Sequence, residues 1–277
     1  MMKRFVLVLL LLSTFTLQSQ TFEIGLYGGL SYYDGDLAPN RLELYFQTLH
    51  PAGGALLRAN VAPWLSFRLG YTNMTLSGDD ALSGRNRRLN FETNINEFAL
   101  SGELNLFQWH LFNTDFFVEP YLYGGAAVFH FSPTAEYERQ TYQLQPLGTE
   151  GQGLPGYEAP YKLWQWAALG GGGIKLHLDE NWILGFEGSG RITFTDHLDD
   201  VSGVSIVYQD ILEGNGELAA RLSRPSFDPE KGDPTRPYRR GGPARDYFFT
   251  VGATITYLFG EGRGLNLGGS KIPCPQF

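Results

Sequence analysis

Long stretches in which apolar and polar residues alternate place the strongest constraint on the fold of this chain. In the stretch 95–107, Phe98 and Leu104 share one face while Glu97 and Glu103 share the other. Because successive side chains of a β-strand point to opposite faces, this period of two predicts strands and not helices. We predict about eight strands, at residues 22–33, 55–61, 65–73, 95–107, 116–131, 163–178, 182–195 and 247–259.

Most of these stretches have the ~9–11 residues that a tilted strand needs to cross a bilayer. Only 18% of the residues are charged, whereas a soluble domain usually carries about a quarter. Beyond the N-terminal segment, no apolar run reaches the ~18 residues of a membrane-spanning helix. We therefore predict an all-β fold, a transmembrane antiparallel β-barrel of about eight strands. A soluble lipocalin-like barrel or a β-sandwich is the alternative.

The connections between the predicted strands alternate between short and long. The short ones are residues 62–63, 108–115 and 179–181, and the long ones are residues 34–54, 78–94, 132–162 and 196–246. Outer-membrane barrels have short periplasmic turns and long external loops. If the N-terminus is periplasmic, every connection falls on its expected side, so we predict that both termini are periplasmic.

Tryptophans lie near both ends of the predicted strands. Trp64, Trp109 and Trp182 accompany the short connections, and Trp164 and Trp166 lie near the opposite end. An indole ring favours the headgroup boundary, where its apolar body is buried and its N–H is hydrated. The final strand also follows the assembly signal of such barrels, a polar residue, then a glycine, then alternating apolar residues. Both features favour the membrane alternative.

The first residues indicate the compartment. A basic start at Lys3 and Arg4 precedes an apolar run and a smaller, more polar stretch, which is the layout of a secretory signal peptide. An N-terminal membrane anchor is the alternative. We predict a signal peptide at 1–19, an outer-membrane β-barrel at 20–260 and a periplasmic tail at 261–277. Outer-membrane lipid would then surround the barrel, and the net charge of -8 argues against a nucleic-acid partner.

Charged residues fall on the face that a membrane barrel turns inward. About eight strands leave an interior just wide enough for side chains, and an isolated buried charge costs several kcal/mol. Acids and bases are therefore expected to pair, Glu187 with Arg191 or another base, and the filled interior predicts no solute conduction. A proton or ion path is the alternative. The predicted inward charges are Glu23, Arg58, Arg68, Glu97, Glu103, Glu119, Lys175, Glu187 and Arg191.

Catalytic and cofactor motifs are scarce, so we predict a protein that is not an enzyme and holds no cofactor or metal. The histidines lack the close spacing of metal ligands, and no serine lies in a Gly-x-Ser-x-Gly motif. One polar cluster in the last long loop comprises Asp196, His197, Asp199 and Asp200. We interpret it as loop scaffolding whose aspartates cap a turn and bind water. Calcium binding by the aspartates and a lipid-trimming site that uses His197 are the alternatives.

The last long connection has further features. Residues 207–212 and 217–222 are each predicted to form a short helix, and the rest of the connection is rich in proline, glycine and arginine. Long loops of this kind tend to be functional or disordered. Its basic cluster either meets lipopolysaccharide phosphates or is ordinary solvated charge. That cluster comprises Arg236, Arg239, Arg240 and Arg245.

Three segments of the chain together resemble one known family. They are residues 23–37, which end Ser31-Tyr32-Tyr33-Asp34-Gly35-Asp36-Leu37, residues 195–202, which read Thr195-Asp196-His197-Leu198-Asp199-Asp200-Val201-Ser202, and residues 239–260, which end Tyr257-Leu258-Phe259-Gly260. In this order they resemble the PorG-like outer-membrane proteins. His197 departs from that family's pattern, in which tyrosine is more usual, and this argues against a catalytic histidine.

The resemblance implies a role in the type IX secretion system of the Bacteroidota. Members of the family are barrels associated with a periplasmic ring made of a lipoprotein and a soluble partner. Within that role, Cys274 in the predicted tail is a candidate for an intermolecular disulfide with the ring lipoprotein, since an unpaired cysteine in an oxidising compartment tends to react or to bond another chain. An inconsequential free thiol is the alternative.

Three functions stay open at this stage. The first is a component of a secretion machine, and the second is a lipid-modifying barrel enzyme. The third is a small barrel of generic structural, adhesin-like or lipopolysaccharide-binding role. Only the second needs His197, and only the first gives a role to a periplasmic contact surface.

Overall fold

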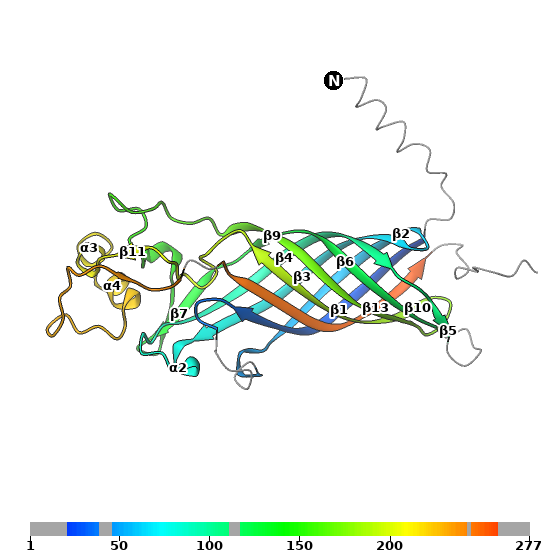
Figure 1. Ribbon diagram of the computed structural model, residues 1–277, viewed down its shortest axis with the longest axis horizontal. Coiled ribbons are helices and arrows are strands. Elements are labelled where there is room, and N and C mark those ends of the chain that lie inside the picture. The colour runs from blue at the N-terminus through cyan, green and yellow to red at the C-terminus, as the bar shows by residue number, and fades with distance from the viewer. Residues whose placement is uncertain (1–20, 39–45, 111–116, 243–244, 260–277) are drawn as a thin grey trace, which may run out of the picture.

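The computed structural model describes residues 21–38, 46–110, 117–242 and 245–259. Eight long antiparallel strands follow one another around a sheet in which the first strand pairs with the last (Figure 1). They are β1 (Thr21–Asp34), β2 (His50–Ala62), β3 (Leu65–Asp79), β4 (Asn90–Asn105), β6 (Phe117–His130), β9 (Trp164–His177), β10 (Trp182–Thr193) and β13 (Tyr247–Phe259). The predicted all-β, eight-stranded antiparallel barrel is confirmed.

The short connections gather at one end of the barrel, which we call the turn end, and the long ones at the other (Figure 1). The turn end carries β5 (Trp109–His110), a two-residue strand paired with β6. Residues 131–163, 194–242 and 245–246 lie beyond the other end, and we call them the cap. The cap contains β7 (Pro133–Tyr137), β8 (Gln140–Gln143), η2 (Gln145–Leu147), β11 (Ser205–Ile206), α3 (Tyr208–Gly214), α4 (Glu217–Ser223) and β12 (Tyr238–Arg239).

The polarity of the barrel reverses along its axis, and β4 shows this most clearly. Near the turn end, Phe98 and Leu104 point outward and are about half exposed, while Glu103 points inward and is buried. At the other end of the same strand, Phe91 and Ile95 occupy the inward face and are buried. Because side chains alternate strictly, the same face changes from charged to apolar without any break in the strand.

We call residues 73–79 of β3 and 90–96 of β4, with the strand ends level with them, the outer half. The remainder is the membrane half. The membrane half turns an apolar belt outward, as a closed sheet in lipid requires, since its backbone groups are satisfied within the sheet. The outer half instead buries an apolar core, as a soluble protein does. That core includes Tyr33, Leu37, Met74, Leu76, Phe91, Ile95, Phe129, Phe131 and Phe248.

The reversal explains where the expected strand ends are wrong. Residues 78–94 are expected to form a long loop, but β3 continues to Asp79 and β4 begins at Asn90. The connection is reduced to a ten-residue turn region around α2 (Asp80–Ser83). In these extensions the apolar residues lie on the opposite face from those in the membrane half, so a single alternation pattern does not include them.

The cap is folded, with an apolar cluster of its own. Its buried residues are Ile206, Tyr208, Ile211, Ala219 and Ala220. The expected helices at 207–212 and 217–222 correspond to α3 and α4. Among the described residues, no helix is long and apolar enough to cross a membrane.

Candidate functional site

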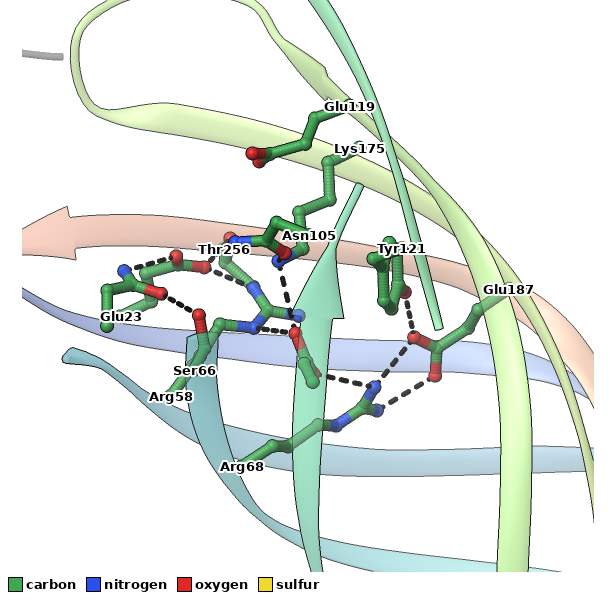
Figure 2. Close-up of polar contacts among 12 residues, drawn as sticks. Glu23, Arg58, Ser66, Arg68, Asn105, Glu119, Tyr121, Lys175, Glu187 and Thr256 are labelled. Carbon is green, nitrogen blue, oxygen red and sulfur yellow. Dashed lines mark hydrogen bonds and ion pairs between the residues drawn. The ribbon is translucent and has the colours of Figure 1, made fainter. Parts of the chain in front are cut away.

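The membrane half of the barrel interior holds a set of charged side chains that we call the inner ion cluster (Figure 2). Each member comes from a different strand, and the alternation of that strand turns its side chain inward. The members are Glu23 of β1, Arg58 of β2, Arg68 of β3, Glu103 of β4, Lys175 of β9 and Glu187 of β10. Acids and bases are therefore equal in number within the cluster.

Arg58 lies at the centre of the cluster and is only 2% exposed. Its Nη1 pairs with Glu23, and its Nε lies 2.7 Å from Oε2 of Glu103. Glu103 also lies 3.1 Å from Nζ of Lys175 and 3.7 Å from Nη1 of Arg68. The register of β2 and β3 places Arg58 directly opposite Arg68. Glu103 offsets the repulsion that two opposed like charges would otherwise cause.

Arg68 completes the cluster through a bidentate ion pair. Its Nη1 and Nη2 donate to the Glu187 carboxylate over 2.7 and 2.8 Å. The Tyr121 hydroxyl donates to the same carboxylate over 2.5 Å. Lys175 donates to the Asn105 side chain over 2.9 Å. A buried charge is tolerated only with such partners, so these contacts fix how the strands lie against one another.

A second ion pair lies between this cluster and the outer half. Arg191 of β10 donates to Glu97 of β4 over 2.8 and 3.0 Å. Glu187 is expected to pair with Arg191 or with another base. It pairs with Arg68, whereas Arg191 pairs with Glu97. The cavity beside these pairs has a volume of about 20 Å³, which is the space of roughly one water.

The structure places all nine predicted inward charges inside the barrel. The ninth, Glu119 of β6, is buried near the turn end, 3.3 Å from Nε2 of His177. Sequence reasoning missed the neutral members of this network, among them Tyr121 and Asn105. Tyr121 alternates in phase with Glu119, so its inward position follows from the strand pattern once the hydroxyl is counted as a polar group.

A second polar site, which we call the cap network, joins the cap to the outer half. Asp200 is fully buried and accepts hydrogen bonds from the hydroxyls of Thr149 and Tyr161, the latter over 2.7 Å. Nη1 of Arg240 lies 3.2 Å from Asp200 and 3.7 Å from Glu150. The expected surface cluster of arginines is therefore wrong at Arg240, which is buried between two acids, whereas Arg236, Arg239 and Arg245 are exposed.

Two further aspartates of the cap network meet at one hydroxyl. Oδ2 of Asp199 and Oδ1 of Asp246 lie 2.7 and 2.8 Å from the Tyr33 hydroxyl. The other oxygen of each carboxyl accepts a backbone N–H, from Val201 and Leu198 respectively, over 2.9 Å. Burial and the neighbouring carboxylate raise the pKa of Asp199 well above its usual range. Burial also raises the pKa of Asp246, to about 8.

His197 lies at the edge of this network. Its ring stacks on Tyr161 with the centroids 4.8 Å apart, and its Nδ1 lies 3.9 Å from Glu150. Glu150 is already bound by Ser202, whose backbone N–H and hydroxyl donate to it over 2.8 and 2.5 Å. Burial, with the Asp36 carboxylate nearby, raises the pKa of Asp196 to about 7.

The structure differs from the expected hydrated loop at two of the four predicted residues. Asp199 and Asp200 are buried and bonded to protein groups, while Asp196 and His197 are half-buried. Among the described residues, no group of acidic, histidine or cysteine side chains is arranged to hold a metal ion, which differs from the calcium alternative. Sequence reasoning missed partners that lie far away in the chain, namely Tyr33, Thr149, Glu150, Tyr161, Arg240 and Asp246.

Several expectations lie outside the described residues. They are the signal peptide at 1–19, the tail at 261–277 and the candidate disulfide at Cys274. The connection 108–115 is described only up to residue 110.

A family model with the description "Domain of unknown function (DUF6089)" matches residues 2–145, just over half of the chain. The chain belongs to this family. The matched part of this DUF6089 member includes β1 to β6 and the first strands of the cap. It therefore contains Tyr33, Arg58, Arg68 and Glu103 but not the residues that meet Tyr33 from the far end of the chain. No curated protein matches.

Several solved structures are similar to this DUF6089 member. The N-terminal β-barrel domain of Pseudomonas aeruginosa OprF is 10% identical, with 87% of this chain and 100% of that chain covered and a TM-score of 0.37. Neisserial surface protein A is 8% identical, with coverages of 86% and 97% and a TM-score of 0.42. OprG from Pseudomonas aeruginosa is 12% identical, with coverages of 87% and 95% and a TM-score of 0.39.

Proposed function

We propose that this protein is an outer-membrane component of the type IX secretion system that contacts the periplasmic ring lipoprotein and its soluble partner. One observation carries the proposal. The three segments that resemble PorG-like proteins, 23–37, 195–202 and 239–260, meet in the cap network. Segments far apart in the chain that converge on one network form a structural unit, which supports a family relationship over three chance matches.

Contacts between these segments are direct. The Gly242 N–H of the third segment donates to the Asp36 carboxylate of the first over 3.0 Å. Arg240 of the third donates to the Asp200 carbonyl of the second over 2.7 Å. Tyr33 of the first bonds Asp199 of the second. The resemblance therefore concerns one site of the molecule.

In this proposal the turn end faces the periplasm and presents the surface that meets the ring. β5 extends the edge of β6 at that end (Figure 1). Its two residues, Trp109 and His110, are both exposed. A folded cap on the opposite side would then remain outside the cell, together with the exposed arginines.

We also infer that the protein acts by binding and not by catalysis. A hydrolytic site needs a nucleophile whose proton passes to a nearby base. Here the Ser202 hydroxyl donates to Glu150 and not to His197, whose ring is stacked on Tyr161. The carboxylate that would orient His197 is thus already occupied by the serine.

An external binding role is the second candidate, and the folded cap favours it. The cap has its own buried cluster around Tyr208 and Ile211, so it is a defined surface and not a loose loop. In this reading the function is adhesin-like or involves lipopolysaccharide, and the turn end needs no partner.

One experiment separates the two candidates. A photo-crosslinking amino acid is placed at His110 on the turn end or at Lys231 on the cap, which is 82% exposed, and living cells of the native bacterium are irradiated. We expect the His110 probe to capture the ring lipoprotein, which should also co-purify in mild detergent, and the Lys231 probe to leave it free. Capture by the Lys231 probe alone would reverse the proposed orientation. If neither probe captures the ring lipoprotein and it does not co-purify, the secretion role is excluded.

A further inference from the structure

The contact between Tyr33, Asp199 and Asp246 is buried and carries no obvious compensating charge. Tyr33 is 0% exposed, Asp199 1% and Asp246 2%. The three side chains come from the outer end of β1, from the cap segment after β10 and from the residue before β13. They join the barrel to both ends of the last long connection, so their bonds hold the base of the cap.

Counting protons at this contact points to one protonated carboxyl. A tyrosine hydroxyl has one proton to donate, yet Tyr33 lies at full hydrogen-bond distance, 2.7 and 2.8 Å, from two carboxyl oxygens. One of these oxygens must therefore donate to the hydroxyl. The outer oxygens of both carboxyls accept backbone N–H groups from Leu198 and Val201, so the proton resides on an oxygen that faces Tyr33.

The charged groups that act most strongly on Asp199 and Asp246 include no cation. The nearby bases are already paired, Arg87 with Asp80 at 2.5 Å and Arg240 with Asp200 at 3.2 Å. Arg191 is bound to Glu97, and its guanidinium lies over the Phe248 ring at 5.6 Å.

The charged groups that do face the contact are acids. Asp36 approaches from the segment after β1, and Asp196 approaches from the cap. Both add repulsion to any second negative charge on the pair, so the singly protonated state is the favoured one when the cap is in place.

We propose that the base of the cap is fastened to the barrel by one proton shared between Asp199 and Asp246 across the Tyr33 hydroxyl, and that losing this proton as the pH rises releases the cap segment 195–202. The inference is independent of the secretion role, because it concerns the contact alone. Gly35 supports it, since a Cβ there would lie 2.0 Å from the Tyr33 oxygen and 2.4 Å from Asp246. The backbone thus closes directly over the contact and keeps water out.

The sign of the pH dependence follows from the pKa of the pair. Burial raises the pKa of Asp246 to about 8, whereas an aspartate in the released segment has a pKa of about 3.9. Between these values, release of the segment also releases one proton from the pair, and below about pH 7 it releases a second one from Asp196, whose pKa burial raises to about 7. The equilibrium constant for release should then rise about a hundredfold per pH unit up to about pH 7 and about tenfold per unit from there to about pH 8, and level off above that. The fastening is complete below that window and weakens as the pH rises through it.

Hydrogen exchange of the purified, full-length barrel in detergent tests this directly. The amides of Leu198 and Val201 donate to the two carboxyls, so the peptide that contains them reports release. Corrected for intrinsic exchange, their protection should fall by about several hundredfold between pH 6 and pH 8. Asp199→Asn places an amide donor where the shared proton lies. The amides of this variant should therefore stay protected, and the slope of the logarithm of protection against pH should be lower by one proton.

Matched variants keep the test decisive. Asp246→Asn should behave like Asp199→Asn, because its amide can donate to the same hydroxyl, and it replaces that variant if one of them does not fold. Asp199→Asn combined with Asp246→Asn directs two donors at Tyr33 and should lose protection at every pH. A wild-type protection that does not change with pH, or single variants with the wild-type slope, would overturn the proposal.

Discussion

The same strands turn charged residues inward in the membrane half of this barrel and apolar residues inward in the outer half. On β4, residues Glu97 and Glu103 are buried inward in the membrane half, whereas Phe91 and Ile95 take the same face in the outer half. On the outward face, the exposed residue is Leu100 in the membrane half and Asn94 in the outer half. Since lipid cannot hydrate a charge and water does not favour exposed apolar surface, the position of the switch marks the membrane boundary.

The two interiors also differ in how they specify the fold. The ion pairs between Arg58 and its acidic partners depend on direction and distance, so losing one partner leaves a buried charge without compensation. The packing of the apolar core around Phe129 depends on side-chain volume, and other apolar side chains of similar size can replace its members at a modest cost in stability. The membrane half should therefore respond more sharply to single substitutions than the outer half.

The largest effect is expected from Arg58→Met. This change leaves Glu23 without its base and removes the closest partner of Glu103. Breaking a buried pair typically costs about 3–5 kcal/mol, and the loss should lower the urea midpoint of the barrel and its heat-modifiable fraction on electrophoresis. Arg58→Met with Glu23→Gln restores the balance of charge and should recover most of that loss. Equal stability of the single variant and the wild type would mean that the cluster does not hold the strands.

A smaller effect is expected from Phe129→Ala in the outer half. Phe129 contacts the rings of Phe131 and Phe248, with centroids 5.8 and 5.6 Å away. Removing it should cost about 3 kcal/mol and make the cap sensitive to protease while the membrane half stays heat-modifiable. Val128→Ala, on the outward face of the same strand, should cost less than about 1 kcal/mol. Simultaneous loss of both halves would show that they unfold as one unit.

The membrane boundary itself can be tested with one charge at two positions. Leu100 is 61% exposed in the apolar belt, so Leu100→Arg should destabilise the barrel in lipid vesicles by about 2 kcal/mol. Asn94→Arg places the same charge on the same face of β4, but in the outer half, and should change stability by less than about 0.5 kcal/mol. If both variants unfold at the same denaturant concentration, the boundary lies elsewhere.

The sequence was sufficient to predict the barrel but not the full length of its strands. Alternation on a fixed face identified Phe98 as outward and Glu103 as inward, because lipid and ion pairing impose a strict period. It failed at Met74 and Phe91, which obey the same period with the polarity reversed. A change of the surrounding medium along one strand cannot be read from a window that assumes a single medium.

Contacts within the sites were harder to foresee than their members. The inward position of Arg68 and Glu187 follows from alternation, but their pairing depends on the curvature that brings β3 opposite β10. The meeting of Tyr33 with Asp246 joins the first strand to the last and leaves no local signal. Glu150 has no pattern of its own, and only the folded cap brings it to Ser202.

The smallest effect is expected at His197. Its ring is half-buried on Tyr161 and makes no hydrogen bond to Glu150, from which its Nδ1 lies 3.9 Å away. His197→Ala should therefore cost no more than the stacking, about 1 kcal/mol, and should leave growth and protein secretion by a complemented deletion strain unchanged. Asp200→Asn is the matched comparison, because asparagine tolerates the φ of 62° at this position. It still removes the charge that Arg240 pairs with, so its melting temperature should fall further than that of His197→Ala. A His197→Ala protein that melts normally but loses a lipid-trimming activity would instead make this edge of the cap network a catalytic site.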